Sequence, residues 1–103
     1  MFKLVFYVPE TAKEAVKQAV FQAGAGTIGD YEHCCWEVQG EGQFRPLPGA
    51  QPHIGRINKL ETVSEYRVEM VCNDDRIQAA VKALKAAHPY EEPAYDVWRL
   101  ELF

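Results

Sequence analysis

Two short clusters in this 103-residue sequence hold side chains that could bind a metal or transfer a proton. The first is His33-Cys34-Cys35. Imidazole and thiolate are the ligands that zinc and copper prefer. Adjacent residues of a strand point to opposite faces, however, so the two cysteines do not readily hold one ion. The plainer and favoured interpretation is that Cys34 packs beside Trp36 as a small buried side chain and that Cys35 is exposed.

The second cluster is His88-Pro89-Tyr90-Glu91-Glu92. An imidazole and two carboxylates could bind a cation or serve proton transfer. The favoured alternative is structural: His88 complements the dipole of a helix, Pro89 ends that helix, and the two glutamates are solvated at a turn.

The third histidine, His53, lies in a segment rich in glycine and proline. Convergence of the three histidines in space would favour a metal site, and the linear sequence leaves that question open. The candidate metal ligands are His33, Cys34, His53, His88, Glu91 and Glu92.

The glycine-rich segment from Gly24 to Gly29 does not have the pattern of a phosphate loop. It follows a predicted helix and lacks the Lys-Ser/Thr pair, whereas phosphate loops follow a strand and open a helix. We predict a turn. No nucleophile elbow or zinc-protease motif occurs, and no Cys-His pair has a recognisable third member. The sequence therefore gives no specific support for catalysis.

The elements that position these clusters begin with a strand and a helix. Residues 2–8 alternate with large side chains on both faces, which predicts a strand. Thr11 and Glu14 have the spacing of a capping box, so a helix is predicted to begin at Thr11. Gly24 suits the left-handed position that ends such a helix. The remaining predicted elements are a strand over 34–39, a turn-rich segment over 40–55, a strand over 65–72, a helix over 77–87 capped by 73–75, and a strand over 94–103.

This order predicts an α+β fold, the ferredoxin-like βαββαβ sandwich, with both helices on one face of an antiparallel four-stranded sheet. A long decorated hairpin is expected between the second and third strands. Apolar residues also occupy the opposite face of the sheet, since several strands are apolar on both sides. The residues assigned to that surface are Val5, Tyr7, Val71, Tyr95 and Val97. Because water is a poor partner for such a surface, we predict self-association.

Composition limits the class of protein. Hydrophobic residues make up 48% of the chain and charged residues 25%, as in an ordinary globular domain, so residues 1–103 are expected to form one domain. The net charge of -4 argues against nucleic acid as a partner, because binding to phosphate backbones needs clustered Lys and Arg. No membrane span or signal peptide is predicted, and three unpatterned cysteines fit a reducing compartment. We expect a cytoplasmic protein.

Five motifs spread over nearly the whole chain resemble a known family. They are residues 24–34, Phe44-Arg45-Pro46, Pro52-His53-Ile54-Gly55, Leu60-Glu61 and residues 88–96. Together they resemble the inserted domain of the Nif-three-like proteins, in its free-standing YqfO-like form. That domain resembles the trimeric cation-tolerance protein CutA and the PII-like signalling fold. The resemblance implies a homo-oligomer, with a trimer favoured over a dimer. The family's dimetal site and its GTP cyclohydrolase label belong to a larger core that these residues do not contain.

Three functions are consistent with these observations. The first is a non-catalytic oligomeric module for regulation or assembly, with a ligand at the loop between the second and third strands and no cofactor. The alternative is a protein that binds a divalent or transition metal through His33 and a cysteine. The third, a nucleotide-processing enzyme, has the least support because the dimetal core is absent.

Overall fold

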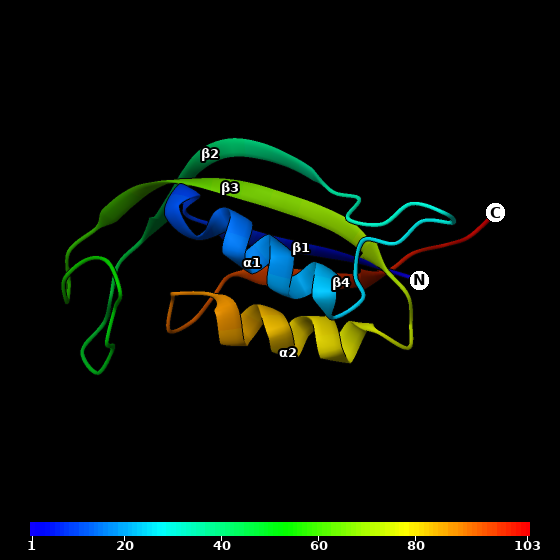
Figure 1. Ribbon diagram of the computed structural model, residues 1–103. Coiled ribbons are helices and arrows are strands. Elements are labelled where there is room, and N and C mark those ends of the chain that lie inside the picture. Colours follow the sequence, from blue (N-terminus) through cyan, green and yellow to red (C-terminus); the bar gives the residue numbers. More distant parts are fainter.

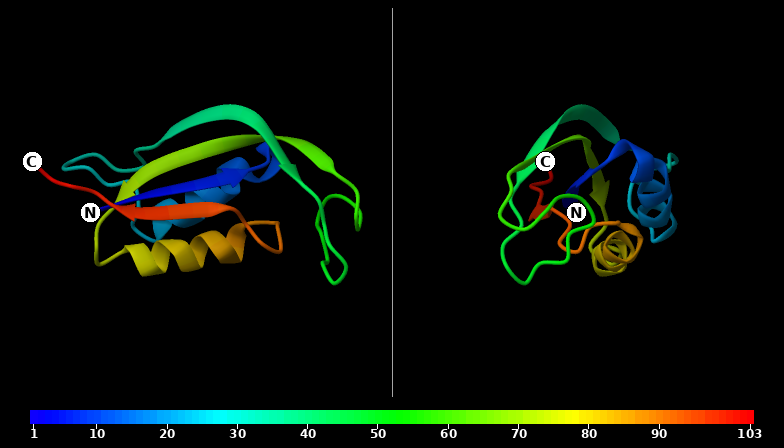
Figure 2. Two further views of the ribbon diagram at one scale, coloured as in Figure 1. Left: turned by 180° about the vertical axis from the view of Figure 1, so that it is seen from behind. Right: turned by 90° about the vertical axis from the view of Figure 1, so that its left-hand side faces the viewer.

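The computed structural model describes residues 1–103 and contains four strands and two helices. They are β1 (Phe2–Val8), α1 (Glu10–Gln22), β2 (Trp36–Phe44), β3 (Glu61–Cys72), α2 (Ile77–Ala87) and β4 (Tyr95–Arg99). The strands form one sheet in the order β2-β3-β1-β4, and every neighbouring pair is antiparallel. Both helices cover the same face of this sheet (Figure 1; Figure 2, right). The predicted ferredoxin-like fold is therefore confirmed.

The hydrophobic core lies between the sheet and the two helices. Alternate residues of the central strands point toward the helices, and apolar residues at helical spacing meet them. The fully buried members are Leu4, Phe6, Val8, Val16, Val20, Val68, Ala80 and Leu84, each 0% exposed. Burial of one Val, Leu or Phe side chain contributes about 1.5–3 kcal/mol, so this layer is the main source of stability. Neither helix is long and apolar enough to cross a membrane.

The face of the sheet turned away from the helices, called the open face below, is not covered by any helix (Figure 2, left). Register places Lys3 opposite both Val71 and Trp98, and Tyr7 opposite Arg67. Val5 and Tyr7 therefore lie on the open face, as predicted.

The same register corrects the assignment of Tyr95 and Val97. They pair with Phe6 and Leu4, so they lie on the helix side, and Lys85 of α2 sits 5.4 Å from the Tyr95 ring centroid. The alternation along the last strand was predicted correctly, but its core face was reversed. An edge strand with large side chains on both faces does not reveal which face meets a helix.

The helix starts also differ from the predictions. Helix α1 begins at Glu10, directly after Pro9, and no side chain caps it, so Thr11 and Glu14 do not form a capping box. Helix α2 likewise has no side-chain cap; Asp74 instead contacts Arg99 and the N-terminal amine. The end of α1 agrees with the sequence. Gly24 has a positive φ of 110°, and its amide donates to the carbonyl of Phe21.

Strands β2 and β3 are longer than predicted. Their pairing runs from Trp36 opposite Glu69 to Phe44 opposite Glu61, whereas β1 ends opposite Tyr66. A two-stranded ribbon therefore projects beyond the sheet and carries the loop at the left of Figure 1. The molecule measures 46 × 25 × 24 Å, so this extension gives it an elongated shape.

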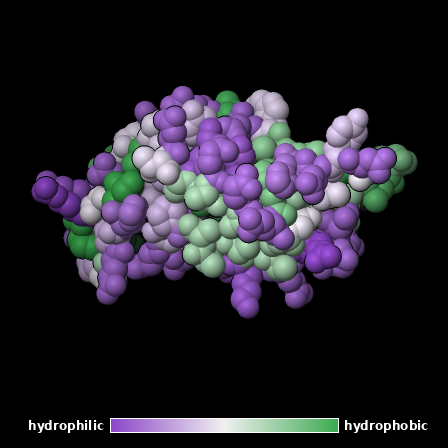
Figure 3. Space-filling model, in the orientation of Figure 1, coloured by the Kyte–Doolittle hydropathy of each residue, from purple (hydrophilic) through white to green (hydrophobic).

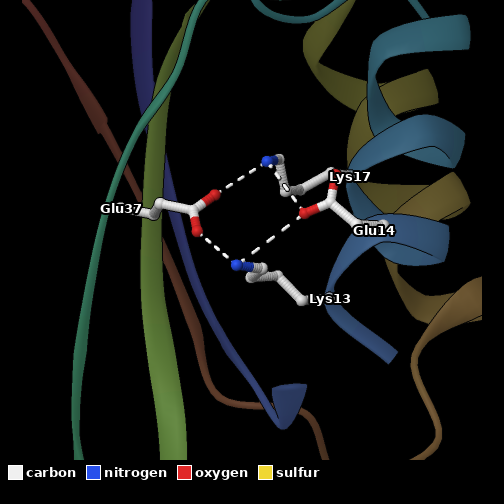
Figure 4. A network of polar contacts seen from close by, with 4 residues as sticks. All are labelled: Lys13, Glu14, Lys17 and Glu37. Carbon is white, nitrogen blue, oxygen red and sulfur yellow. Dashed lines mark hydrogen bonds and ion pairs between the residues drawn. The ribbon is translucent and has the colours of Figure 1, made fainter. Parts of the chain in front are cut away.

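One carboxylate ties edge strand β2 to helix α1. Glu37 points to the helix side of β2 and accepts hydrogen bonds from Lys13 Nζ at 2.5 Å and Lys17 Nζ at 2.7 Å (Figure 4). Glu14 adds a longer contact to each lysine, 3.8 Å to Lys13 and 3.2 Å to Lys17. The bond from Lys13, followed by that from Lys17, holds the pKa of Glu37 below its ordinary value of 4.5. Glu37 thus stabilises the folded state when it is ionised.

Replacing Glu37 with Gln is expected to lower the melting temperature at pH 7, because both lysines lose their shared counter-ion. A lowered folded-state pKa gives stability that is present above the unfolded pKa, near 4.5, and lost as pH falls through the folded pKa. The difference between wild type and E37Q should therefore disappear in strong acid. Thermal unfolding at a series of pH values measures this difference in melting temperature, with E41Q on the same strand as the control. Equal melting temperatures for E37Q and E41Q at pH 7 would contradict this role.

Candidate functional site

A hollow of about 410 Å³ lies where the projecting ribbon meets the end of the sheet. Two segments enclose it: the β2–β3 loop (residues 45–60) and the α2–β4 turn (residues 88–94). The β2–β3 loop exposes Leu47, Ile57 and Leu60. Hydrophobic residues lie among hydrophilic ones at this end of the molecule, at the left of Figure 3. The hollow is lined by Tyr7, Gln43, Phe44, Arg45, Pro46, Leu47, Ala50, Pro52, His53, Ile54, Glu65, Tyr90, Glu91, Glu92 and Ala94.

His88 anchors the turn to the sheet. Its side chain is 6% exposed, and its Nε2 lies 2.7 Å from the carbonyl oxygen of Tyr7. Its Nδ1 accepts from the backbone amide of Tyr90 at 3.1 Å, so Nε2 carries the proton and donates to Tyr7. Burial lowers the pKa of His88, with a smaller contribution from nearby His53. Both ring nitrogens are engaged within the chain, and neither is directed to the hollow as a free ligand.

Tyr90 is the centre of an aromatic group beside the hollow. Its ring centroid lies 4.9 Å from that of His88, 6.1 Å from that of His53 and 6.4 Å from that of Phe44. Its hydroxyl is buried and has no hydrogen-bond partner. Burial raises the pKa of Tyr90, and the charge of Glu65 adds to this effect. A buried hydroxyl without a hydrogen-bond partner costs free energy, so Tyr90 carries an unsatisfied polar group beside the hollow.

Glu65 reaches the same hollow from the open face of β3. It pairs in register with Gly40, and its carboxylate lies over Gly42, where an added Cβ would be 2.1 Å from Oε1. No hydrogen bond or ion pair reaches this carboxylate. Burial raises the pKa of Glu65 above its ordinary value of 4.5. Sequence reasoning missed Glu65, although two glycines facing an acidic residue across a hairpin are a signal for such a site.

The two glutamates of the second cluster lie at the mouth of the hollow. Glu91 and Glu92 are exposed, and Glu91 accepts from the backbone amide of Gln51 at 3.0 Å. This bond joins the β2–β3 loop to the α2–β4 turn. His53 is also exposed and belongs to the same wall.

The first cluster lies at the opposite end of the sheet, before β2 (Figure 1). His33 has a φ of 60° and stacks on Phe21, with ring centroids 4.8 Å apart. The predicted roles of the cysteines are not what the structure shows: Cys34 is only half-buried, and Cys35 packs against the core. Burial raises the pKa of the Cys35 thiol.

The three histidines therefore do not converge. His53 and His88 both lie beside Tyr90, but His33 is separate from them. No three His, Cys, Asp or Glu side chains lie close enough together to hold a metal ion.

The glycine-rich segment is a turn, as predicted. Ile28 and Tyr31 exchange backbone hydrogen bonds across it. Gly26 has a φ of 80°, and an added Cβ would be 2.8 Å from the Phe21 ring. Its amide donates to the carbonyl of Val71 and its carbonyl accepts from the amide of Cys34, each at 2.8 Å. Glycine at this position therefore lets the turn pack closely against Phe21 and β3.

The arrangement of elements is the ferredoxin-like fold that CutA proteins also have. CutA from Xylella fastidiosa superposes with a TM-score of 0.71 over 99% of this chain and 85% of its own, at 19% identity. The periplasmic divalent cation tolerance protein CutA from Archaeoglobus fulgidus gives 0.70 at 14% identity. These likenesses show the shared fold.

Sequence similarity is more specific. The chain is 52% identical over 98 residues to the GTP cyclohydrolase 1 type 2 homolog of Mycobacterium tuberculosis and 46% identical over 99 residues to that of Bacillus subtilis. A Bacillus cereus protein related to NIF3 superposes with a TM-score of 0.85 at 40% identity, over 98% of this chain. The chain spans 26% of the length of each of these relatives. No protein-family model matches the chain. The resemblance to the inserted, CutA-like domain of the Nif-three-like family is confirmed.

Replacing His88 with Ala is expected to destabilise the protein by about 2 kcal/mol, because two buried hydrogen bonds are lost and a cavity forms. Urea denaturation at pH 7.5 measures the change. The control is H53A, which removes an exposed imidazole that makes no hydrogen bond in the structure. Equal stability of H88A and H53A would contradict the anchoring role of His88.

The stability of the wild type is expected to depend on pH through the same residue. The folded-state pKa of His88 lies below the ordinary value of 6.5, so the unfolded chain binds a proton first as pH falls. This contribution is fully present above pH 6.5 and is lost as pH falls toward the folded pKa. Wild type and H53A should lose stability between neutral and mildly acidic pH more steeply than H88A. Parallel profiles of stability against pH for H53A and H88A would contradict this contribution of His88.

Proposed function

We propose that the chain is a non-catalytic, self-associating domain for regulation or assembly that binds a small ligand in the hollow. The observation that carries this proposal is the open face of the sheet. Trp36 and Val38 of β2 are 60% and 42% exposed, and Trp98 of β4 is 43% exposed. All three lie on the open face, across the full width of the sheet. An uncovered apolar face of this kind is typical of a protein interface.

The charges on the open face suit a second copy of the same chain. Lys3 and Arg67 alternate with Glu69 and Asp96 between the apolar side chains. Lys3 and Arg67 each contact Glu69, at 3.7 Å and 3.1 Å. Because both signs are present on one surface, two copies can meet without like charges facing each other. We therefore propose that the chain forms a homo-oligomer through this face, with a trimer favoured over a dimer.

The hollow supports binding and gives little support for covalent catalysis. Its wall contains no Ser, Thr, Cys or Lys, and no hydrogen bond joins one of its His, Glu or Tyr side chains to a second side chain as a nucleophile and its base. Most of the wall is aromatic or aliphatic, with a few polar groups, as in ordinary small-molecule sites. The name GTP cyclohydrolase 1 type 2 homolog is carried by proteins about four times longer than this chain. We propose that residues 1–103 serve such a protein, or act alone, as a binding and assembly unit.

The wild type is expected to elute as a multiple of 11.7 kDa at micromolar concentration, and Trp98→Glu is expected to shift it to the monomer. A buried, unpaired carboxylate in an interface opposes association. Size-exclusion chromatography with light scattering measures the mass. The matched control is Val97→Glu, since Val97 is the adjacent residue, is 36% exposed and faces α2 instead. A monomeric wild type, or an equal effect of both substitutions, would contradict the proposal.

A further inference from the structure

The chemical character of the hollow indicates which class of ligand it takes. Three carboxylates line it, those of Glu65, Glu91 and Glu92, against one guanidinium, that of Arg45. This excess of negative charge disfavours phosphates and carboxylic acids as ligands and favours cations.

Glu65 is the carboxylate best placed to receive a cation. It has no hydrogen-bond or ion-pair partner, whereas one oxygen of Glu91 already accepts from the amide of Gln51. Glu65 also lines a second hollow on the open face, with Tyr7, Gly42 and Arg67. The carboxylate therefore belongs to both hollows and occupies the space that a side chain at position 42 would fill.

The walls beside Glu65 suit the body of an organic cation. Tyr7, Phe44 and Tyr90 supply aromatic rings, and the electron-rich face of an aromatic ring attracts a cation. The Tyr90 hydroxyl, buried without a partner near Glu65, is a further polar group that an ordered ligand could satisfy after a small rotation of the side chain. A bare metal ion would not make use of these rings, and no cluster of metal ligands is present.

We propose that the hollow binds a small organic cation, a primary ammonium group on an apolar body, with Glu65 as its counter-ion and Tyr7, Phe44 and Tyr90 as its walls. This inference rests on the binding site of the proposed function and specifies its ligand class. The volume of about 410 Å³ lies at the lower end of the range for small-molecule pockets, which limits the ligand to a compact molecule.

Three probes of similar shape and different charge test the proposal: 2-phenylethylammonium, 2-phenylethanol and 3-phenylpropionate. Isothermal titration calorimetry gives their affinities, and amide chemical shifts locate the site. The ammonium probe is expected to bind about tenfold more tightly than the alcohol, because it gains a charge-assisted hydrogen bond, and the carboxylate is expected to bind more weakly than the alcohol. The shifts should centre on Tyr7, Phe44, Glu65 and Tyr90.

Glu65→Gln is the decisive variant. It should reduce the affinity for 2-phenylethylammonium about tenfold and leave the affinity for 2-phenylethanol within about twofold. Glu61→Gln, on the same strand and outside this hollow, is the control and should change neither affinity. Equal binding of the ammonium and the alcohol, or unchanged selectivity in E65Q, would overturn the proposal.

The outcomes separate this inference from the proposed function. Binding of the alcohol or the carboxylate in the hollow without preference for the ammonium would overturn the ligand class and leave the binding site in place. If none of the probes binds, the inference is overturned, and the mass in solution still decides whether the chain self-associates. Binding of the ammonium probe to a monomeric chain would support the inference and contradict the assembly role.

Discussion

Both helices of this domain pack on the same side of its sheet, and the rest of the structure depends on that constraint. Leu4, Phe6 and Val8 are fully buried beneath the helices, so the alternate residues of β1 must face the other way. The open face consequently includes large apolar side chains such as Trp36 and Trp98 that no helix of the chain covers. The cost of leaving them in water is the physical reason to expect a second copy of the chain there.

The hollow results from a second feature, the unequal length of the strands. Strands β2 and β3 continue past the end of β1, and the loop they carry turns back toward the α2–β4 turn (Figure 1). The buried imidazole of His88 fixes that turn to β1, and the bond between Gln51 and Glu91 closes the loop on it. Glu65 enters from the sheet because Gly42 leaves room. The hollow and the open face share this carboxylate, so ligand binding and self-association involve neighbouring surfaces.

Much of the fold could be predicted from the sequence because its signals are local. Alternation in residues 2–8 and the apolar stripe of α2 set the strand and helix boundaries to within a residue or two. The capping motif at Thr11 was misleading, because the helix begins at Glu10 with Pro9 in the N-cap position, and no side chain forms a capping hydrogen bond. The face of the sheet predicted for Tyr95 and Val97 was also wrong. This edge strand has large side chains on both faces, and only packing against α2 distinguishes them.

The site was harder to predict because it depends on contacts between distant residues. His88 and Glu91 were identified as candidates, but the spacing alone did not reveal that His88 is a buried anchor bonded to Tyr7, 81 positions away. His33 and the cysteines attracted attention for their chemistry, yet they lie at the far end of the sheet, with His33 stacked on Phe21. Glu65 and Tyr90 became visible as site residues through the structure, which places the Glu65 carboxylate beside Gly42 and buries the Tyr90 hydroxyl without a hydrogen-bond partner.

The two tryptophans offer the most direct test of the claim that the open face is covered in solution. The chain contains only Trp36 and Trp98, and both lie on that face. Quenching of their fluorescence by acrylamide at micromolar protein concentration therefore measures how well the face is covered. The account predicts that quenching is much weaker than for free tryptophan amide and becomes stronger on dilution. Quenching as strong as that of the free amide, at every protein concentration, would contradict it.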